Sequence, residues 1–344
     1  MLPFTDPINP PRLLGPSLGC ARFKSVLEDF VVEEILGFEP TGEGEHCLVW
    51  VEKVDRNTND VAAEFAKKLG IRKRLVNHCG LKDRIGITRQ WFNLHLPGIA
   101  SPSAEDLNYE GVSVLKITRN LRTLRRGCHR GNRFTIRLRD CTFTQEAAAD
   151  RWQKIVERGV PNYFGPQRFG RDGGNMEHAR RLMSGEVEVR DRALRGILIS
   201  AARSYIFNDC VAQRVANGSW DMPMDGEIFG FPDNRSLVIP GNRRGDEFDR
   251  VRNGTLELTG PLWGAGDLLS YGQVREFEER VAQCSPEIIA GLAQYNLNQE
   301  RRVIRLKPES SGLTWEDGST LVLQFDLPTG TYATTLLREL VDWD

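Results

Sequence analysis

Strand-like segments occur along the first 140 residues of the chain and return near its C-terminal end. In the segment 133–139, Phe134, Ile136 and Leu138 alternate with polar residues, which is the period-two pattern of a strand with one buried face. Similar patterns predict strands over 46–54, 75–79, 92–96, 111–118 and 321–327. Because strands at both ends of the chain can pair in one sheet, this arrangement predicts an α+β protein.

The middle of the chain has a different pattern, which is rich in helices and begins near Gly159. Helices are predicted over 60–69, 145–157, 176–183, 200–216 and 331–341. Asn59 can cap the first of these helices and Gly70 can end it. We therefore expect a sheet-containing core that is interrupted by an inserted segment.

Composition excludes several classes of protein. With 40% hydrophobic and 27% charged residues, the chain is typical of a globular protein. Its seven cysteines form no CxxC pair, so we expect neither a disulfide framework nor a structural zinc site. No run approaches 18 apolar residues and the N-terminal segment does not resemble a signal peptide. These features predict a cytoplasmic protein without a membrane span.

Charge is distributed unevenly, although the formal net charge is only −1. Residues 28–52 hold eight acidic side chains and no Lys or Arg, whereas residues 117–139 hold eight arginines. Residues 71–90 and 301–307 form two further basic clusters. Basic clusters that alternate with aromatics and glycines suit a polyphosphate backbone, and a solvated surface is the simpler alternative.

Common catalytic motifs are absent or misplaced. The sequence has no GxxxxGK[ST] and no HExxH, so it lacks the signatures of a P-loop and of a zinc peptidase. The GxSxG match at 15–19 lies in a proline-rich segment rather than at a strand-to-helix turn. His78 and Cys79 are adjacent, which is poor geometry for two ligands to one metal, so we expect them to be packed residues.

The segment most informative about chemistry is 77–91, which includes GLKDRIGITRQ at 80–90. Asp83 lies there among Lys82, Arg84 and Arg89, and these cations favour a carboxylate over a carboxylic acid. Such a carboxylate can act as a nucleophile toward a sugar carbon. An ordinary surface ion pair remains the alternative on spacing alone.

This segment resembles the active-site signature of the TruD family of tRNA pseudouridine synthases. The resemblance continues in order over about residues 20–340. It includes EDFVVEEILGFEPTGEGEH at 28–46, RGCHRGNRF at 126–134, VPNYFGPQRFG at 160–170, SAARSYIFN at 200–208 and PTGTYAT at 328–334. The chain departs from the family pattern at Tyr332, where Phe is usual, and at Gly86, where Ala is usual; we expect the glycine to loosen the loop after Asp83.

The resemblance implies an isomerase, an intramolecular transferase that converts uridine to pseudouridine in tRNA, at position 13 in bacterial members. It implies a pseudouridine-synthase core, a mixed and largely antiparallel sheet with flanking helices, formed by residues 1–158 and 306–344. The inserted α/β domain, the TRUD domain, is expected at 159–305. A monomer that needs neither a cofactor, nor a metal, nor a protein partner is expected.

The resemblance also implies site residues. Asp83 would be the nucleophile, and whether it attacks the ribose or the base, or first forms an elimination product, stays open. The residues expected to bind the substrate are Lys24, Phe30, Lys82, Arg84, Asn132, Phe134 and Tyr332. Core packing is a serious alternative for Phe134. An RNA-binding or tRNA-chaperone protein without chemistry is the alternative function, and a glycoside hydrolase would need a second carboxylate near Asp83.

Overall fold

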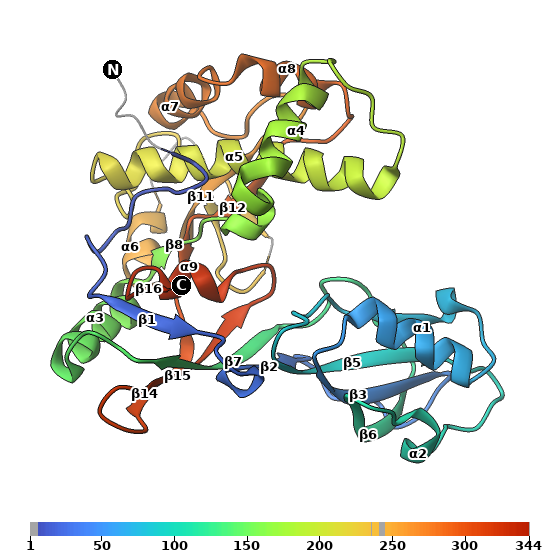
Figure 1. Ribbon diagram of the computed structural model, residues 1–344. Helices are drawn as coiled ribbons and strands as arrows, with labels where there is room; N and C mark the ends of the chain where they lie inside the picture. The colour runs from blue at the N-terminus through green and yellow to red at the C-terminus, as the bar shows by residue number, and fades with distance from the viewer. Residues whose placement is uncertain (1–5, 235, 241–244, 344) are drawn as a thin grey trace. The chain divides into compact units, whose positions relative to one another are not determined.

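The computed structural model describes residues 6–234, 236–240 and 245–343 (Figure 1). Its contacts divide the chain into two compact units. Unit 1 comprises Met1–Pro16, Glu157–Lys307 and Thr331–Glu339, and unit 2 comprises Ser17–Val156, Pro308–Gly330 and Leu340–Asp344. No helix among the described residues is both long and apolar enough to cross a membrane.

Unit 2 is built on one ten-stranded sheet, whose central path runs β14-β15-β7-β2-β5-β3-β6. Its strands are β1 (Cys20–Phe23), β2 (Phe30–Ile35), β3 (His46–Val54), β4 (Val76–His78), β5 (Ile87–His95), β6 (Val112–Asn120), β7 (Gly131–Arg139), β14 (Glu309–Trp315), β15 (Leu321–Pro328) and β16 (Asp342–Trp343). The pair β2–β5 is parallel, as is β1–β16, and the other pairs are antiparallel. The prediction of a mixed, largely antiparallel sheet is therefore confirmed.

Helices cover parts of this sheet. They are α1 (Thr58–Lys68), α2 (Ala104–Leu107) and α3 (Gln145–Arg158), with short 3-10 turns η1 (Leu27–Asp29) and η2 (Lys73–Leu75). The apolar face of α1 packs on β3 and β5, where the rings of Phe65 and Phe92 lie 5.4 Å apart. Trp152 of α3 packs near Phe325 of β15, with 5.7 Å between ring centroids.

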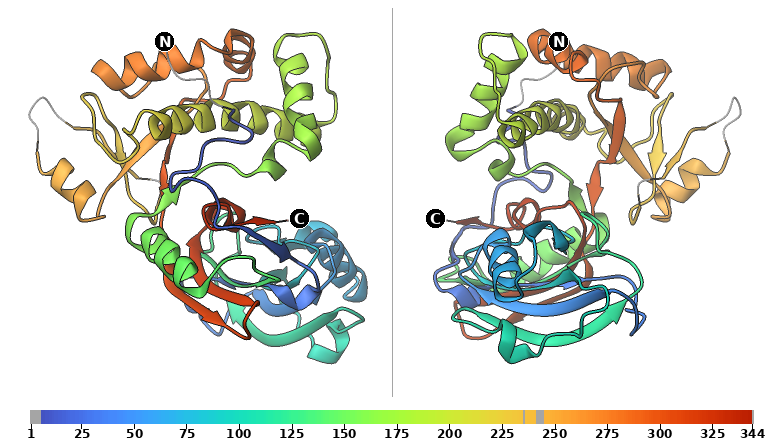
Figure 2. Two further views of the ribbon diagram at one scale, coloured as in Figure 1. Left: turned by 60° about the vertical axis from the view of Figure 1, so that its left-hand side comes forward. Right: turned by 90° about the vertical axis from the view of Figure 1, so that its right-hand side faces the viewer.

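Unit 1 combines helices with a small sheet, β10-β9-β11-β12, and a two-stranded pair, β8-β13. Its elements are β8 (Val160–Pro161), η3 (Pro166–Arg168), η4 (Arg171–Gly173), α4 (Gly174–Met183), α5 (Arg192–Ala216), β9 (Phe229–Gly230), β10 (Leu237–Val238), α6 (Glu247–Arg252), β11 (Glu257–Leu262), α7 (Gly272–Ala282), α8 (Pro286–Ala293), β12 (Glu300–Val303), β13 (Arg305–Leu306) and α9 (Ala333–Leu337). Figure 2 shows α5 packed against α4, α7 and α8.

Two terminal segments pack in unit 1 rather than with the sheet of unit 2, which differs from the expected division of the chain. The Glu339 carboxylate accepts hydrogen bonds from the backbone N–H groups of Leu13 and Leu14, at 3.1 and 3.0 Å. The Asn208 side chain of α5 donates to the carbonyl of Pro7 at 2.8 Å. Hydrogen bonds between distant segments, which no local pattern encodes, hold these ends in unit 1.

Candidate active site

Asp83 lies in the loop between β4 and β5. Its side chain is 40% exposed, and one carboxylate oxygen accepts a 2.9 Å hydrogen bond from the ammonium of Lys24. Lys24 directly follows β1 and has a left-handed backbone, with φ of 57°. Its Nζ also lies 3.7 Å from the centroid of the Phe30 ring. The ammonium is thus held between a carboxylate and an aromatic ring, an arrangement in which both partners attract the cation.

The three consecutive charged side chains of this loop make three different ion pairs. Lys82 turns inward and donates to Glu34 at 2.7 Å, and both side chains are almost inaccessible to solvent. Arg84 turns outward and pairs with Asp55 at 2.8 Å. A direct contact between Lys82 and a phosphate would therefore require the buried pair with Glu34 to open.

Lys53 on β3 holds the backbone of the Asp83 loop. The sequence analysis did not identify it. Its fully buried ammonium donates to the backbone carbonyls of Asp83 at 2.6 Å and Arg56 at 2.8 Å. Burial lowers the pKa of Lys53 from its ordinary 10.5 to about 8, although the Asp83 carboxylate opposes part of this shift. A signal did exist, because Lys53 continues the buried row formed by Val49 and Val51 on β3.

Gly86 ends the loop in a conformation that favours glycine. Its φ is +136°, and an added Cβ would lie 2.5 Å from the carbonyl oxygen of Phe30. In this chain the glycine therefore allows the loop to lie close to β2, and the expectation that it loosens the loop remains a prediction.

Phe30 and Glu34 on β2 share one face of the sheet with Asn132 and Phe134 on β7. Glu34 on β2 lies directly opposite Asn132 on β7, and Phe134 lies two residues farther along the same face. The amide oxygen of Asn132 is buried and has no hydrogen-bond partner among the described residues. Phe134 is buried, stacks on Phe325 at 5.5 Å and lies 6.1 Å from Phe30. Its contacts are those of a core residue that supports Phe30.

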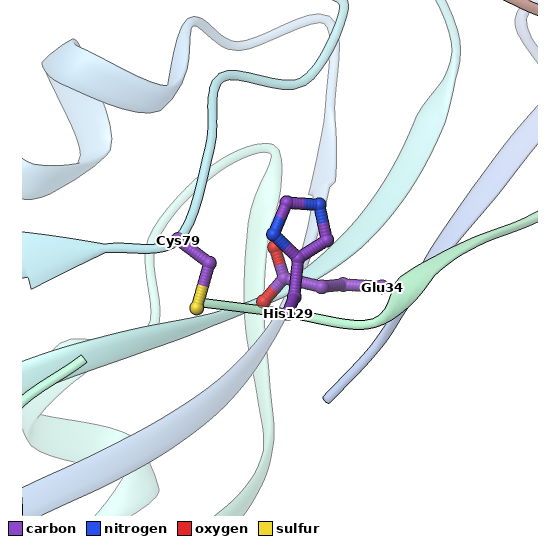
Figure 3. Close-up of side chains that lie close together, drawn as sticks. All are labelled: Glu34, Cys79 and His129. Atoms are coloured by element: carbon purple, nitrogen blue, oxygen red, sulfur yellow. The ribbon is translucent and has the colours of Figure 1, made fainter. Parts of the chain in front are cut away.

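A second cluster lies at the start of the Asp83 loop, which begins with Cys79. Figure 3 shows Glu34, Cys79 and His129 converging, and their potential ligand atoms lie within 4.8 Å of one another. Burial, together with the Lys82 ammonium, lowers the pKa of His129 to about 4, so its imidazole is neutral at pH 7. Carboxylate, thiol and imidazole are donors that suit a transition metal. In this structure, however, the Lys82 ammonium already provides the cation that faces Glu34.

Tyr332 belongs to unit 1, unlike the other seven predicted site residues. Its hydroxyl accepts a 2.7 Å hydrogen bond from the guanidinium of Arg168, which also donates to Ser200 at 2.9 Å. The ring of Phe164 lies 6.2 Å away. The hydroxyl that distinguishes Tyr332 from Phe is therefore satisfied within its own unit.

Several arginines of the basic clusters are paired with carboxylates inside the fold. On β7, Arg133 pairs with Asp326, Arg137 with Glu316 and Arg139 with Asp29. In unit 1, Arg301 pairs with Glu278 and Arg305 with Glu257. These side chains hold structural elements together, which leaves less positive charge available on the surface than the sequence indicated.

Other basic side chains remain unpaired in the part of the chain that the structure describes. They line a surface pocket of about 430 Å³, formed where η2 and β4 meet the connection between β6 and β7. The pocket cations are Lys73, Arg74, Arg125 and Arg126. No carboxylate lines this pocket, so it is suited to an anionic ligand.

The accessible Asp83 carboxylate and the basic pocket beside β4 are typical of a protein that acts on a phosphate-bearing ligand. The sequence profile of the family described as tRNA pseudouridine synthase D (TruD) matches residues 16–189 and 175–340. The chain belongs to this family.

Relatives of similar length support this membership. The chain is 41% identical over 336 residues to the tRNA pseudouridine synthase D of Pseudomonas fluorescens (strain Pf0-1), covering 96% of this chain and 94% of the relative. It is 42% identical, with the same coverage, to that of Pseudomonas entomophila (strain L48). A crystal structure from Methanosarcina mazei, assigned as tRNA pseudouridine synthase D (TruD), has a TM-score of 0.70 at 20% identity. It covers 98% of this chain and 96% of its own, and it shows a shared fold.

Proposed function

We propose that this protein isomerises uridine to pseudouridine in tRNA, at position 13, with Asp83 as the nucleophile. The observation that carries the proposal is the partly exposed Asp83 carboxylate, fixed by Lys24 in the GLKDR loop of a chain that belongs to the TruD family. The named activity of the relatives supports the same conclusion.

The reaction requires a nucleophile but neither a hydrolytic nor a redox step. The bond between uracil N1 and ribose C1′ breaks, the uracil turns, and C5 bonds to C1′ while C5 loses a proton and N1 gains one. An Asp83 oxygen can begin this sequence by attacking C1′ of the ribose or C6 of the base. Both routes use the same carboxylate, so both depend on the contacts that hold Asp83.

The neighbouring residues have roles that follow from their contacts. Lys24 holds the carboxylate and covers the Phe30 ring, which is only 4% exposed, so that ring can form an apolar wall for a uracil only when Lys24 moves aside. The unpartnered oxygen of Asn132 can accept a hydrogen bond from an N–H of the base. Phe134 supports Phe30. The expected contact of Tyr332 with the substrate remains a prediction.

Binding of the tRNA backbone is assigned to the pocket cations. Four cations without carboxylate neighbours suit phosphodiester groups, whose binding releases counterions and depends strongly on salt. Arg84 is exposed and can exchange its Asp55 partner for a phosphate. Lys82 has a supporting role through Glu34, and contacts RNA only if that pair opens.

The remaining expectations form part of the same proposal. We assign unit 2 to the pseudouridine-synthase core and the middle segment of unit 1 to the inserted TRUD domain. A tRNA substrate implies action in the cytoplasm. We propose that the enzyme acts as a monomer, without a protein partner or a cofactor.

Position mapping tests the proposed product. Purified protein is incubated with a transcript of a tRNA that has uridine at position 13, and pseudouridine is located by carbodiimide modification and reverse transcription. We expect one new stop, one nucleotide to the 3′ side of position 13, which is missing from a matched transcript with cytidine at position 13. A stop elsewhere would refute the position, and no stop with bound tRNA would favour an RNA-binding protein without chemistry.

A further inference from the structure

Two thiols face each other at the base of the Asp83 loop. Cys79 directly follows β4, and Cys128 lies in the connection between β6 and β7. Their sulfur atoms are 3.2 Å apart. The backbones are also adjacent, because the N–H of Gly127 donates to the carbonyl of Cys79 at 2.7 Å. A disulfide needs about 2.05 Å between sulfur atoms, so a movement of roughly 1 Å would allow the bond to form.

The two thiols differ in exposure. Cys79 is only 1% exposed, whereas Cys128 is exposed to solvent. Burial, and then the Glu34 carboxylate, raise the pKa of the Cys79 thiol. An oxidant from solvent therefore reaches Cys128 first, while Cys79 lies in position to react with the product. This division between an exposed thiol and a resolving thiol is typical of reversible oxidation sites.

A metal site is the competing interpretation of Cys79, because Glu34 and His129 are close to it (Figure 3). The Lys82 ammonium argues against this interpretation. It binds Glu34 at 2.7 Å and is almost fully buried, so a cation bound to Glu34 would leave a second buried positive charge beside it. The pairing of Cys79 with Cys128 requires no change at Glu34.

We propose that Cys79 and Cys128 form a reversible disulfide under oxidation by a peroxide. Hydrogen peroxide transfers one oxygen to the Cys128 sulfur, which gives a sulfenic acid and one water. The Cys79 sulfur then attacks the Cys128 sulfur, the Cys79 proton passes to the departing hydroxyl as the S–O bond breaks, and a second water leaves. The two thiols lose two electrons in total, and the peroxide gains them. A small dithiol reverses the reaction by exchange.

The disulfide would connect two segments of the proposed active site. Cys79 lies four residues before Asp83, and Cys128 lies four residues before Asn132. The backbone between Cys79 and Asp83 is closely packed. A Cβ at Gly80 would lie 3.3 Å from the His129 ring and 3.8 Å from Lys82 Nζ. A sulfur movement of roughly 1 Å is thus transmitted to the loop, and displacements of that size can lower a catalytic rate by about 10²-fold.

Peptide mapping of the full-length protein tests the disulfide. Trypsin cleavage after Lys and Arg gives the peptides 75–82 and 127–130, each of which contains one cysteine. Protein is treated with dilute hydrogen peroxide, its remaining thiols are blocked with N-ethylmaleimide, and non-reduced digests are analysed by mass spectrometry. We expect these two peptides to be linked, with a mass two hydrogens below their sum, and dithiothreitol to separate them.

Two cysteine variants and an experiment with added Zn²⁺ separate the disulfide from the metal site. In Cys128→Ser, we expect Cys79 to remain a thiol under the same treatment, and in Cys284→Ser, which removes another exposed cysteine, the link should form as in the wild type. Cys128 oxidised to a sulfinic acid beside an unlinked Cys79 would overturn the proposal. Protection of both thiols by stoichiometric Zn²⁺, without a peroxide-induced link, would favour the metal site instead.

Turnover gives a second readout, which rests on the proposed function. We expect oxidation to lower kcat at least about tenfold and dithiothreitol to restore it, with Cys128→Ser unaffected by peroxide. A linked protein with unchanged kcat would refute the effect on the loop. Because linkage is detected by mass, inactivity of the reduced protein would count against the proposed function and leave the disulfide test intact.

Discussion

Lys53 combines full burial with partners that carry no charge. Its ammonium binds the carbonyl oxygens of Asp83 and Arg56, and it thereby fixes the backbone of the residue proposed as nucleophile. Burying an ammonium costs free energy, and this cost lowers the pKa of Lys53 to about 8. The structure retains this unfavourable group at the point where it can position Asp83, which makes Lys53 a positioning residue.

We expect Lys53→Met to lower kcat by about 10²-fold, because the Asp83 backbone loses its donors, with little change in tRNA affinity. Wild-type kcat should also fall above pH about 8, where the ammonium becomes an amine with one fewer N–H. Lys53→Arg, which stays charged, should keep its activity at higher pH. Full kcat in Lys53→Met, or the same alkaline decrease in Lys53→Arg, would contradict this role.

The Glu34–Lys82 pair is a second buried arrangement at the residue scale. Lys82→Met leaves the Glu34 carboxylate buried without its cation, and we expect this to cost about 3–5 kcal/mol in the free energy of unfolding. The double variant Glu34→Gln with Lys82→Met should recover part of the loss. Guanidinium denaturation measures the free energy of unfolding of the single and the double variant. A loss below about 1 kcal/mol in Lys82→Met would show that the lysine is free for another role.

At the scale of elements, the strands are where sequence reasoning succeeds best. The strand predicted over 46–54 is β3 (His46–Val54), and that over 133–139 is β7 (Gly131–Arg139). Alternation reports burial directly, so these predictions are confirmed. The helix predicted over 331–341 is wrong in extent, because α9 ends at Leu337 and Asp342 pairs with Cys20 in a parallel bridge.

The helix α5 illustrates a missed local signal. The sequence predicted a helix over 200–216, but α5 begins at Arg192. Asp191 caps it by accepting hydrogen bonds from the backbone N–H groups of Ala193 and Leu194, at 2.7 and 3.1 Å. An aspartate before a helical run is a recognised start signal, so this boundary was accessible from the sequence.

Two neighbouring segments, η2 and the connection after β6, bring the pocket cations together. We expect Arg125→Ala and Arg126→Ala each to weaken tRNA binding and to reduce the slope of log K against log salt by about 1. Arg137→Ala is the matched control, because Arg137 already pairs with Glu316. Fluorescence titrations at several salt concentrations measure these slopes. Equal slopes in all three variants and the wild type would exclude phosphate binding at this pocket.

At the scale of the whole molecule, contacts between distant segments limit what the sequence could predict. A short motif predicted Asp83 as the nucleophile, and the family resemblance predicted Lys24 and Asn132 as substrate-binding residues; the structure pairs Lys24 with Asp83, and the roles remain predictions. Lys53, Glu34 and His129 were missed because their importance arises from strand pairing and loop packing. The arginines of β7 looked like an RNA-binding surface until the carboxylates opposite them were placed. Side-chain pairing between strands decides which positive charges remain available to bind a phosphate.

Release of tritium from uridine C5 shows whether Asp83 performs uridine isomerisation. tRNA that carries tritium at uridine C5 is incubated with the wild type and with Asp83→Asn, which keeps the size of the side chain but removes its charge. Formation of the new bond at C5 must release that tritium to water. We predict release by the wild type and none by Asp83→Asn, with both binding tRNA equally. Equal release by the two proteins would contradict the assignment of Asp83.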